Sequence, residues 1–459
     1  MINPTLEICH LANEISCSKI SKNIINKSKL LLKDGLGVML AGMRHPTIKL
    51  LSEHIKELEC KPVSPIYGYN FSSSPQEAAF INGAATHVLD FEPMFNPPTH
   101  VVSPILSGIL ALAYYDNREF NGEKFLEAFI AGVQFQADLR KAAHVSDHIA
   151  NKNKNHFPFQ KQGFHPPGTV GALGSALASG IWIGLNNEQL SMALGISASR
   201  SSGIAGNIGT MTKSSHCGHA ARVGVESALL ARRGFTASLD TIGGPSGWGD
   251  VYGGKGFDIN MLKKGMSLIN CFDDPGFAFK KWPTHTAMQI AINSAIPLYK
   301  SDYIPKKVEI ATPIFKYCNR PFPKDSDDAR FSFQYNVALG ILDGQVDFDS
   351  YTSNRLNSND MTTLLSRISL TMDSNIISDF NEMEVKIILD DGRSSESDRW
   401  PGHWKSPASE IELKNKFIKC ASQLYNKENT ELLNDSLDNI ESISSFKKTL
   451  SILGEMEAS

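Results

Sequence analysis

Histidines that stand beside glycines, prolines and predicted helix starts are the side chains of this sequence best suited to chemistry. The chain has 13 histidines. Those in such positions are His87, His100, His165, His216, His219 and His285. An imidazole titrates near neutral pH, so it can transfer protons, bind anions or ligate metals. The charged residues around each histidine indicate which of these roles is open to it.

The first candidate group runs from His87 to His100. The spacing of His87 and Asp90 predicts that both lie on one face of a helix, and Asp90 precedes a proline-rich loop that ends at His100. A carboxylate and an imidazole at a helix end can act as a general acid–base pair. An aspartate that caps a loop and a histidine that satisfies a buried carbonyl group would have the same spacing, so both interpretations stay open.

The second group, Gly209–His219, leads through small residues into a predicted helix. The free N–H groups and the dipole of a helix start favour an anion, and Lys213 adds a positive charge there. The segment does not match the phosphate-loop pattern, so a nucleotide site is not expected. His216, Cys217 and His219 indicate zinc only weakly, because no carboxylate or second cysteine pair stands at ligand spacing.

The third group combines lysines with a histidine at another predicted helix start. Lys280 and Lys281 precede Thr284, which can cap a helix over 286–299. His285 would then lie in the positive first turn, where the dipole lowers the proton affinity of an imidazole and favours a bound carboxylate. Two surface lysines and a solvated histidine are the alternative interpretation.

His165 belongs to a fourth group, the loop Gly163–Gly168, which has two prolines and precedes an apolar helix. Together the four groups offer cations, imidazoles and one carboxylate, without a metal or nucleotide motif. Such side chains fit a small anionic substrate, in particular a polycarboxylate, that reacts by proton transfer without a cofactor.

Charge and cysteine content exclude several classes of protein. The 459 residues include 45 basic and 48 acidic side chains, for a net charge of -3, so the basic excess of a general nucleic-acid binder is missing. The seven cysteines are an odd number without a CxxC pair, which argues against a disulfide framework or a structural zinc module. The first 16 residues lack the layout of a signal peptide. The uncharged stretches Val101–Tyr115 and Thr169–Leu185 are shorter than the ~20 residues of a membrane span. We therefore expect a cytoplasmic protein that binds neither nucleic acid nor membrane.

Helical patterns dominate up to about residue 265 and return after about residue 408. The predicted helices there are Ala78–Leu89, opened by a capping box over Ser74–Glu77, then Gly168–Leu185, Gly218–Arg233, Glu410–Tyr425 and Leu432–Lys448. The helix over Gly168–Leu185 is apolar nearly all round, so it should lie at the centre of a helical domain.

Between these helical regions, over residues 266–408, the sequence contains strand patterns as well as helical ones. Strands are predicted over Lys307–Ile310, Arg367–Met372 and Met383–Leu389, with helices over Thr286–Tyr299 and Phe331–Leu342. Strands mixed with helices in this way are typical of an α+β domain. The predicted fold is therefore mostly α: a large all-helical domain over 1–265, completed by 409–459, and a smaller α+β domain over 266–408.

The candidate motifs occur in an order that resembles the MmgE/PrpD family, which includes 2-methylcitrate dehydratase, cis-aconitate decarboxylase and iminodisuccinate epimerase. The similar segments are Lys27–Met43, Asn82–Phe91, Gly163–Gly174, Gly209–Ala221, Phe279–His285 and Asp328–Gly344. They span nearly the whole chain, so the resemblance is far more specific than any single pattern.

The resemblance implies a homodimer in which a large helical domain and a smaller α+β lid enclose the active site, with no metal or organic cofactor. On this basis we assign to catalysis Asp90, His100, His165, Lys213 and His285. We assign to substrate binding Lys280, Tyr317, Met94 and His216. Asp90 and His100 match the acid–base pair of the family, and Tyr317 resembles a pocket tyrosine of the cis-aconitate decarboxylase branch in particular.

The sequence departs from the family pattern directly after Asp90. The usual Asp-Phe-Asp-Asp-Thr reads Asp90-Phe91-Glu92-Pro93-Met94 here. Met94 takes the place of a threonine that would hydrogen-bond substrate, and a thioether cannot donate. This exchange predicts a substrate of different shape or lower polarity.

The leading hypothesis is a lyase that removes water or carbon dioxide from a citrate-like acid. Lys213, Lys280 and His285 would hold the carboxylates, while Asp90 and His100 relay the proton. An epimerase stays open, because the same residues could abstract a proton next to a carboxylate and return it on the other face. A non-catalytic ligand-binding protein and, more weakly, a zinc hydrolase are alternatives from other classes.

Overall fold

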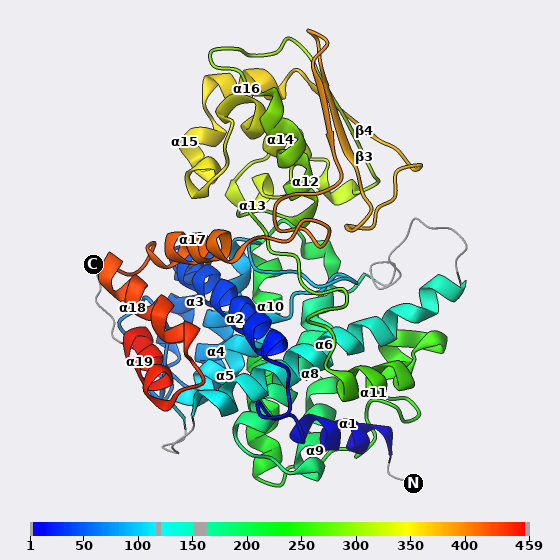
Figure 1. Cartoon of the computed structure of the whole chain (residues 1–459), viewed down its shortest axis with the longest axis vertical. Helices are drawn as coiled ribbons and strands as arrows, with labels where there is room; N and C mark the ends of the chain where they lie inside the picture. The colour runs from blue at the N-terminus through cyan, green and yellow to red at the C-terminus, as the bar shows by residue number, and fades with distance from the viewer. Residues whose placement is uncertain (1–2, 116–120, 151–162, 455–459) are drawn as a thin grey trace.

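The computed structural model in Figure 1 describes residues 3–115, 121–150 and 163–454. A large helical part occupies the lower two thirds of the view, and a smaller part with the strands β3 and β4 stands above it. The prediction of a mostly α fold with a smaller α+β part is confirmed. Within the described ranges, no helix combines the length and the hydropathy that crossing a bilayer requires.

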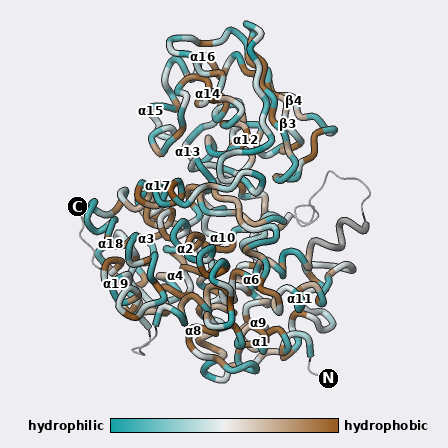
Figure 2. Tube along the Cα trace, in the orientation of Figure 1, coloured by the Kyte–Doolittle hydropathy of each residue, from teal (hydrophilic) through white to brown (hydrophobic). Residues whose placement is uncertain are grey.

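The helical part is built from the N-terminal helices and three helices of the C-terminal tail. Their bounds are α1 Pro4–Asn13, α2 Lys22–Gly42, α3 Pro46–Glu57, α4 Pro75–Val88, α5 Val102–Ala113, α6 Gly122–Ala150, α8 Pro166–Trp182, α9 Asn187–Ala198, α10 Met211–Arg232, α11 Ile259–Leu268, α17 Glu410–Ala421, α18 Lys427–Asp438 and α19 Ile443–Gly454. A two-stranded ladder, β1 Ser64–Pro65 and β2 Ser72–Ser73, precedes α4. In Figure 2 apolar residues recur along these packed helices.

Helix α8 forms the centre of the helical part, as its all-round apolar pattern predicts. Every residue of α8 is buried, and α8 packs against α5, α6, α9 and α10. Helix α10 packs equally closely on α4: a Cβ atom at Gly218 would lie 2.2 Å from the carbonyl oxygen of Phe80. This backbone-to-backbone approach fixes the end of α4 beside the start of α10, where the candidate residues lie.

Two predictions, about the start of α4 and about the C-terminal tail, are wrong. Ser74 makes no side-chain capping hydrogen bond at the start of α4, and Glu77 pairs with Arg222 of α10. The single helix predicted over Leu432–Lys448 is two helices, α18 and α19. The hydroxyl of Ser442 accepts a hydrogen bond from the N–H of Ser445 at 3.2 Å and so begins the second one.

The upper part packs helices against a four-stranded sheet. Its helices are α12 Thr286–Ala295, α13 Ser326–Ala329, α14 Phe333–Asp343, α15 Ser353–Leu356 and α16 Asn359–Leu365. Its strands are β3 Val308–Thr312, β4 Ile368–Met372, β5 Val385–Leu389 and β6 Ser394–Ser397. The strand order is β4-β3-β5-β6, with β3 parallel to β4 and antiparallel to β5, and β5 antiparallel to β6. In β3 and β5 alternate side chains are buried, which is the pattern of a sheet covered on one face.

Apolar side chains gather in two clusters. One draws its members from Ile8–Phe272 and from Phe417–Leu453. The other contains Met94 together with residues of the segment Ala278–Trp400. We call this segment the lid below.

The chain crosses between the two parts at two places that lie side by side. The N–H of Phe279 donates to the carbonyl oxygen of Gly402 at 2.8 Å, and the indole of Trp400 donates to the carbonyl oxygen of Phe279 at 2.8 Å. A third contact comes from Met94, whose backbone exchanges two hydrogen bonds with Ala278, at 2.9 and 3.0 Å. The two chain crossings therefore form one narrow junction next to the candidate site, and further contacts, such as the Lys419–Asp347 ion pair and the hydrogen bond from Asn96 to Asp379, join the two parts elsewhere.

Candidate functional site

A pocket lies where the helical part meets the lid. The predicted residues that line it are Met94, His100, His165, Lys213, His285 and Tyr317. Thr286 and Phe331 are further lining residues that were not predicted. Asp90 contacts this set through an ion pair with Lys213, Lys280 forms an ion pair with Asp90, and His216 contacts His165.

A left-handed turn after α4 places Asp90. Helix α4 ends at Val88, the N–H of Asp90 donates to the carbonyl oxygen of His87 at 2.9 Å, and Asp90 has a φ of 49°. Aspartate is one of the few residues other than glycine that adopt this conformation readily. The prediction that His87 and Asp90 share a helix face is therefore wrong, because Asp90 lies outside the helix and turns towards the lid.

Lys213 reaches the site from the first turn of α10. The predicted helix over Gly218–Arg233 actually begins at Met211. His216 and Cys217 therefore lie inside the helix and not in a loop before it.

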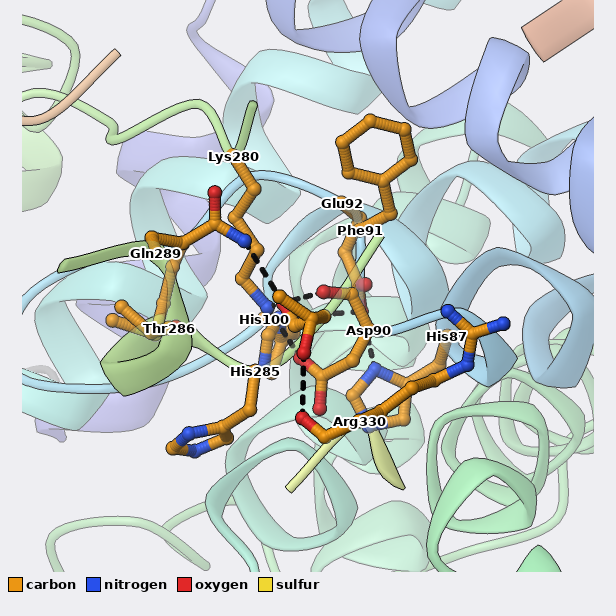
Figure 3. Close-up of polar contacts among 12 residues, drawn as sticks. His87, Asp90, Phe91, Glu92, His100, Lys280, His285, Thr286, Gln289 and Arg330 are labelled. Atoms are coloured by element: carbon orange, nitrogen blue, oxygen red, sulfur yellow. Dashed lines mark hydrogen bonds and ion pairs between the residues drawn. The ribbon is translucent and has the colours of Figure 1, made fainter. Parts of the chain in front are cut away.

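Asp90 lies between two lysines that come from opposite parts of the molecule. Figure 3 shows Asp90 and Lys280 in one group of polar contacts. Its carboxylate forms one ion pair with Lys213 of α10 and another with Lys280 of the lid, and Lys280 also donates to the carbonyl oxygen of Asp90 at 2.7 Å. The side chains of Asp90 and Lys280 are 2% and 0% exposed. Two positive charges against one negative charge leave this cluster with a surplus cation beside the pocket.

The pKa of Asp90 follows from the same contacts. Burial alone would raise it, but Lys213 and Lys280 outweigh burial and hold the pKa of this carboxyl well below its ordinary value. Burial lowers the pKa of Lys280, although Asp90 opposes that shift. Asp90 is therefore ionised at neutral pH and holds the two cations in place.

Glu92 was not predicted, yet it organises the histidines of the helical part. Its Oε1 atom accepts hydrogen bonds from Nδ1 of His87 and from the hydroxyl of Ser103, the latter at 3.0 Å. Nδ1 of His100 lies 3.2 Å from the same oxygen, without hydrogen-bond alignment. Burial raises the pKa of Glu92, but His87 and His100 outweigh burial and lower it overall. The sequence did contain a sign of this role: Glu92 is an acidic residue in the segment that departs from the family pattern, and it stands close to His87 and His100.

His100 is held with one nitrogen towards Glu92, while its ring lines the pocket. Burial moves the pKa of His100 well below its ordinary value, although Glu92 works against that shift. His100 is therefore neutral at neutral pH. The nearby carboxylate favours the tautomer with the proton on Nδ1, and in that tautomer Nε2 can accept a proton.

His285 and Tyr317 form a pair on the lid side of the pocket. His285 is itself the N-cap of α12, and its Nδ1 accepts from the N–H of Ala287 at 3.3 Å. The prediction that Thr284 caps this helix is wrong, because its hydroxyl donates to the carbonyl oxygen of Arg330 at 2.6 Å. Burial lowers the pKa of His285 to about 3.

The hydrogen-bond pattern of His285 defines what Tyr317 can do. Because Nδ1 is an acceptor and the ring is neutral, the proton sits on Nε2, which lies 3.4 Å from the hydroxyl oxygen of Tyr317. Burial raises the pKa of Tyr317 well above its ordinary value, so the phenol keeps its proton. That proton is available to an oxygen atom in the pocket.

His165 and His216 face each other on the remaining side. Their Nδ1 atoms are 3.1 Å apart, so one ring donates to the other. Burial lowers the pKa of His216 to about 4 and that of His165 well below its ordinary value. His165 lines the pocket, whereas His216 lies behind it as a support for His165.

Among the described residues, one group of possible metal ligands adjoins the site: His87, Glu92 and Cys217, whose ligand atoms lie within 4.8 Å of one another. The possible zinc ligands considered from the sequence were His216, Cys217 and His219. In the structure Cys217 belongs instead to the group with His87 and Glu92. The group fits a metal poorly: burial and Glu92 raise the pKa of Cys217 well above its ordinary value, which opposes the thiolate that a metal needs. Glu92 is also already engaged by His87.

The arrangement as a whole suits a small anion. It offers a surplus cation at Lys213 and Lys280, a neutral donor at Tyr317 and neutral imidazoles at His100 and His165. Cations and neutral donors bind carboxylates, and a neutral imidazole beside a carboxylate can take or give a proton.

Comparisons with known proteins cover nearly the whole chain. The MmgE/PrpD N-terminal domain matches residues 6–260, and the MmgE/PrpD C-terminal domain matches residues 282–439. Cis-aconitate decarboxylase of Homo sapiens is 30% identical over 441 residues, which cover 92% of this chain and 89% of that protein. The enzyme of the same name from Mus musculus is 29% identical and covers 94% of this chain and 89% of its own. A cis-aconitate decarboxylase-like protein of Aspergillus oryzae is 22% identical and covers 99% of this chain and 98% of its own.

Proposed function

This chain belongs to the MmgE/PrpD family, and from that membership we propose that it is a cofactor-independent lyase acting on a small citrate-like polycarboxylate. Removal of carbon dioxide from cis-aconitate is the first reaction to consider, because relatives of that name match more than nine tenths of the chain. Removal of water, as in 2-methylcitrate dehydratase, is the second.

The observation that carries the proposal is the Asp90 carboxylate held between Lys213 and Lys280 in a buried position. The pair of lysines leaves a net positive charge where a substrate carboxylate would lie. When a C–C bond to a carboxylate breaks, its electron pair stays on the substrate, and nearby cations lower the energy of that developing charge. Preorganised charges in a dry site achieve this without reorganising solvent.

His100 is the proposed proton carrier. Its neutral ring has Nε2 free, and Glu92 at 3.2 Å from Nδ1 stabilises the imidazolium that forms once a proton is accepted. In a dehydration the ring would accept the proton next to a carboxylate and pass it to the leaving hydroxyl. In a decarboxylation the ring would first take up a proton from water at Nε2 and then deliver it to the carbon that loses carbon dioxide, returning to the neutral form.

A screen by mass spectrometry tests the proposal directly. Purified protein is incubated with cis-aconitate, 2-methylcitrate, citrate or iminodisuccinate, and we expect loss of carbon dioxide or of water from at least one of them. His100→Ala should stay folded and lose kcat by roughly 100-fold or more, the usual range for a general acid–base group. Full activity of His100→Ala, or no reaction with any of the acids, would overturn the proposal.

An epimerase is the second candidate, favoured by the placement of acid–base groups on two sides of the pocket. His100 comes from the helical part, whereas His285 and Tyr317 come from the lid. Abstraction of a proton on one face and its return on the other needs such an arrangement. Incubation in deuterated water separates the reactions: deuterium exchange without loss of water or carbon dioxide would favour the epimerase.

A further inference from the structure

The side chain of Met94 stands at a fixed position in the pocket. Its backbone is bound to Ala278 by two hydrogen bonds, and its side chain lines the pocket while only 3% of Met94 is exposed. In the sequence Met94 stands where a threonine of the related proteins would offer a hydroxyl to the substrate. Taken alone, this exchange predicts a less polar pocket.

The structure supplies a hydroxyl at the same place from a different element. Thr286, the first residue of α12, donates from Oγ1 to the Sδ atom of Met94 at 3.1 Å. Thr286 also lines the pocket. The polar group that position 94 lacks is therefore present at contact distance, carried by the lid.

The acceptor of this hydrogen bond is unusual. A thioether sulfur is a weak acceptor, whereas a carboxylate oxygen accepts a shorter and roughly twofold stronger hydrogen bond. A hydroxyl that donates to a thioether sulfur therefore loses only a weak hydrogen bond when it turns towards a carboxylate. Since a hydroxyl rotates freely about its C–O bond, the change needs no movement of the backbone.

We propose that Thr286 is a specificity-determining residue, whose hydroxyl donates to a carboxylate of the bound substrate and rests on the sulfur of Met94 when the pocket is empty. The inference rests on the proposed function, since it concerns recognition of the same polycarboxylate. Together with Tyr317, Thr286 provides a neutral donor from the lid, facing the cation of Lys213 from the helical part. A substrate carboxylate would then contact both parts at once.

The same contact could instead only tie the lid to the helical part, and two substitutions separate these roles. Thr286→Val keeps the shape of the side chain and removes the donor, while Thr286→Ser keeps the donor and removes a methyl group. Thr449→Val is a matched control, because Thr449 is a buried threonine of α19 whose hydroxyl pairs with Ser436 at 2.8 Å. Helix α19 belongs to the tail and lies away from the lid (Figure 1).

The measurement is kcat/KM for cis-aconitate, with thermal unfolding of each variant alongside. We expect Thr286→Val to lower kcat/KM roughly 10- to 100-fold, mainly through KM, because a hydrogen bond to a charged group is lost. Thr286→Ser should restore most of the activity, and Thr449→Val should leave KM unchanged. Wild-type kcat/KM in Thr286→Val, or equal losses in the valine and serine variants, would overturn the inference.

Failure of the proposed function can be told apart from failure of this inference. If the wild-type protein converts none of the acids, the proposed function fails, and thermal stabilisation by citrate becomes the readout. Thr286→Val must then lose clearly more of that stabilisation than Thr449→Val. Equal stabilisation of the two variants, or none in the wild-type protein, would overturn the inference.

Discussion

Glu92 is the residue on which the histidines of the helical part converge. One oxygen, Oε1, contacts His87, His100 and Ser103. In the described part of the chain, no group hydrogen-bonds its other oxygen, Oε2. A carboxylate in this position fixes which nitrogen of His100 carries the proton, and so decides whether the ring can act as a base.

Replacing Glu92 with Gln tests this role. The amide keeps the size of the side chain but loses the charge that stabilises a protonated His100. We expect kcat to fall roughly 10- to 100-fold, the range for groups that orient a catalytic residue, with a smaller change in KM. The control is Glu226→Gln, which removes a half-exposed carboxylate paired with Arg200. An unchanged kcat in Glu92→Gln would show that His100 needs no orienting carboxylate.

At the scale of elements, the turn after α4 is held from two sides by lysines. Lys280 donates to the carbonyl oxygen of Asp90 at 2.7 Å, and Lys416 of α17 donates to that of Phe91 at 2.9 Å. Lys416 also pairs with Asp34 of α2 at 2.8 Å, and its Nζ lies 3.9 Å from the ring centroid of Phe91. The C-terminal tail thus positions the turn that carries the central carboxylate.

Removing this support should slow the reaction without unfolding the protein. Lys416→Met alone would leave Asp34 buried and unpaired, so the informative variant is Asp34→Asn combined with Lys416→Met. We expect kcat to fall roughly 10- to 100-fold, because a small displacement of a catalytic group has that effect. Asp34→Asn alone keeps the donor to Phe91 and should lose less.

Lys414→Met provides the matched control on the same helix, since Lys414 is exposed. If the double variant has the kcat of this control, α17 does not position the turn.

Sequence pattern predicted the elements whose own residues determine them. Helix α8 was predicted because its residues are apolar on all sides. The strands β3, β4 and β5 were predicted from β-branched residues and from the alternation of side-chain polarity. The start of α10 was missed, since the helix begins at Met211 and not at Gly218. The division at residues 265 and 408 stays a prediction.

Within the candidate site, residue types and the family resemblance together named six of the 15 residues that line the pocket. Neither could reveal that Asp90 binds two lysines more than 100 positions away along the chain, since ion pairs across such a distance depend on the fold. Glu92 and Thr286 were missed for the same reason: each gains its role from a partner on another element.

At the scale of the whole molecule, buried histidines dominate the expected response to acid. Burial lowers the pKa of His45, His87, His100, His165, His216, His219, His285 and His403. Below about pH 6.5 the unfolded chain takes up protons at these histidines and the folded protein does not, so stability falls. Burial raises the pKa of Asp34, Asp138 and Asp327, which works in the opposite direction. The histidines outnumber these carboxyls, so we expect a net loss of stability from pH 6.5 towards pH 4.

His45 allows this linkage to be measured away from the pocket. It caps α3 through Nδ1, and burial lowers its pKa to about 3. His45→Asn keeps a capping side chain and removes the titration. Between pH 6.5 and 4.5, the free energy of unfolding of His45→Asn should then fall less steeply than that of the wild type. The two slopes should differ by at most about 1.4 kcal/mol per pH unit, the contribution of one titrating group. Denaturant unfolding at several pH values measures it, with exposed His54→Asn as the control. Parallel profiles for wild type and His45→Asn would contradict the prediction.

The homodimer implied by the family resemblance and the cytoplasmic location inferred from the composition are still predictions for this chain. Sedimentation or light scattering of the purified protein would determine the first, and imaging of a tagged chain would determine the second.

The narrow junction between Phe279 and Gly402 has an evolutionary consequence. A segment whose two ends lie side by side can be exchanged between homologous genes by recombination without cutting through the helical core. Such an exchange would bring in His285, Thr286 and Tyr317 together and leave Asp90 and His100 in place. New substrate preferences could then be inherited as a block, while the proton-transfer apparatus stays with the ancestral half.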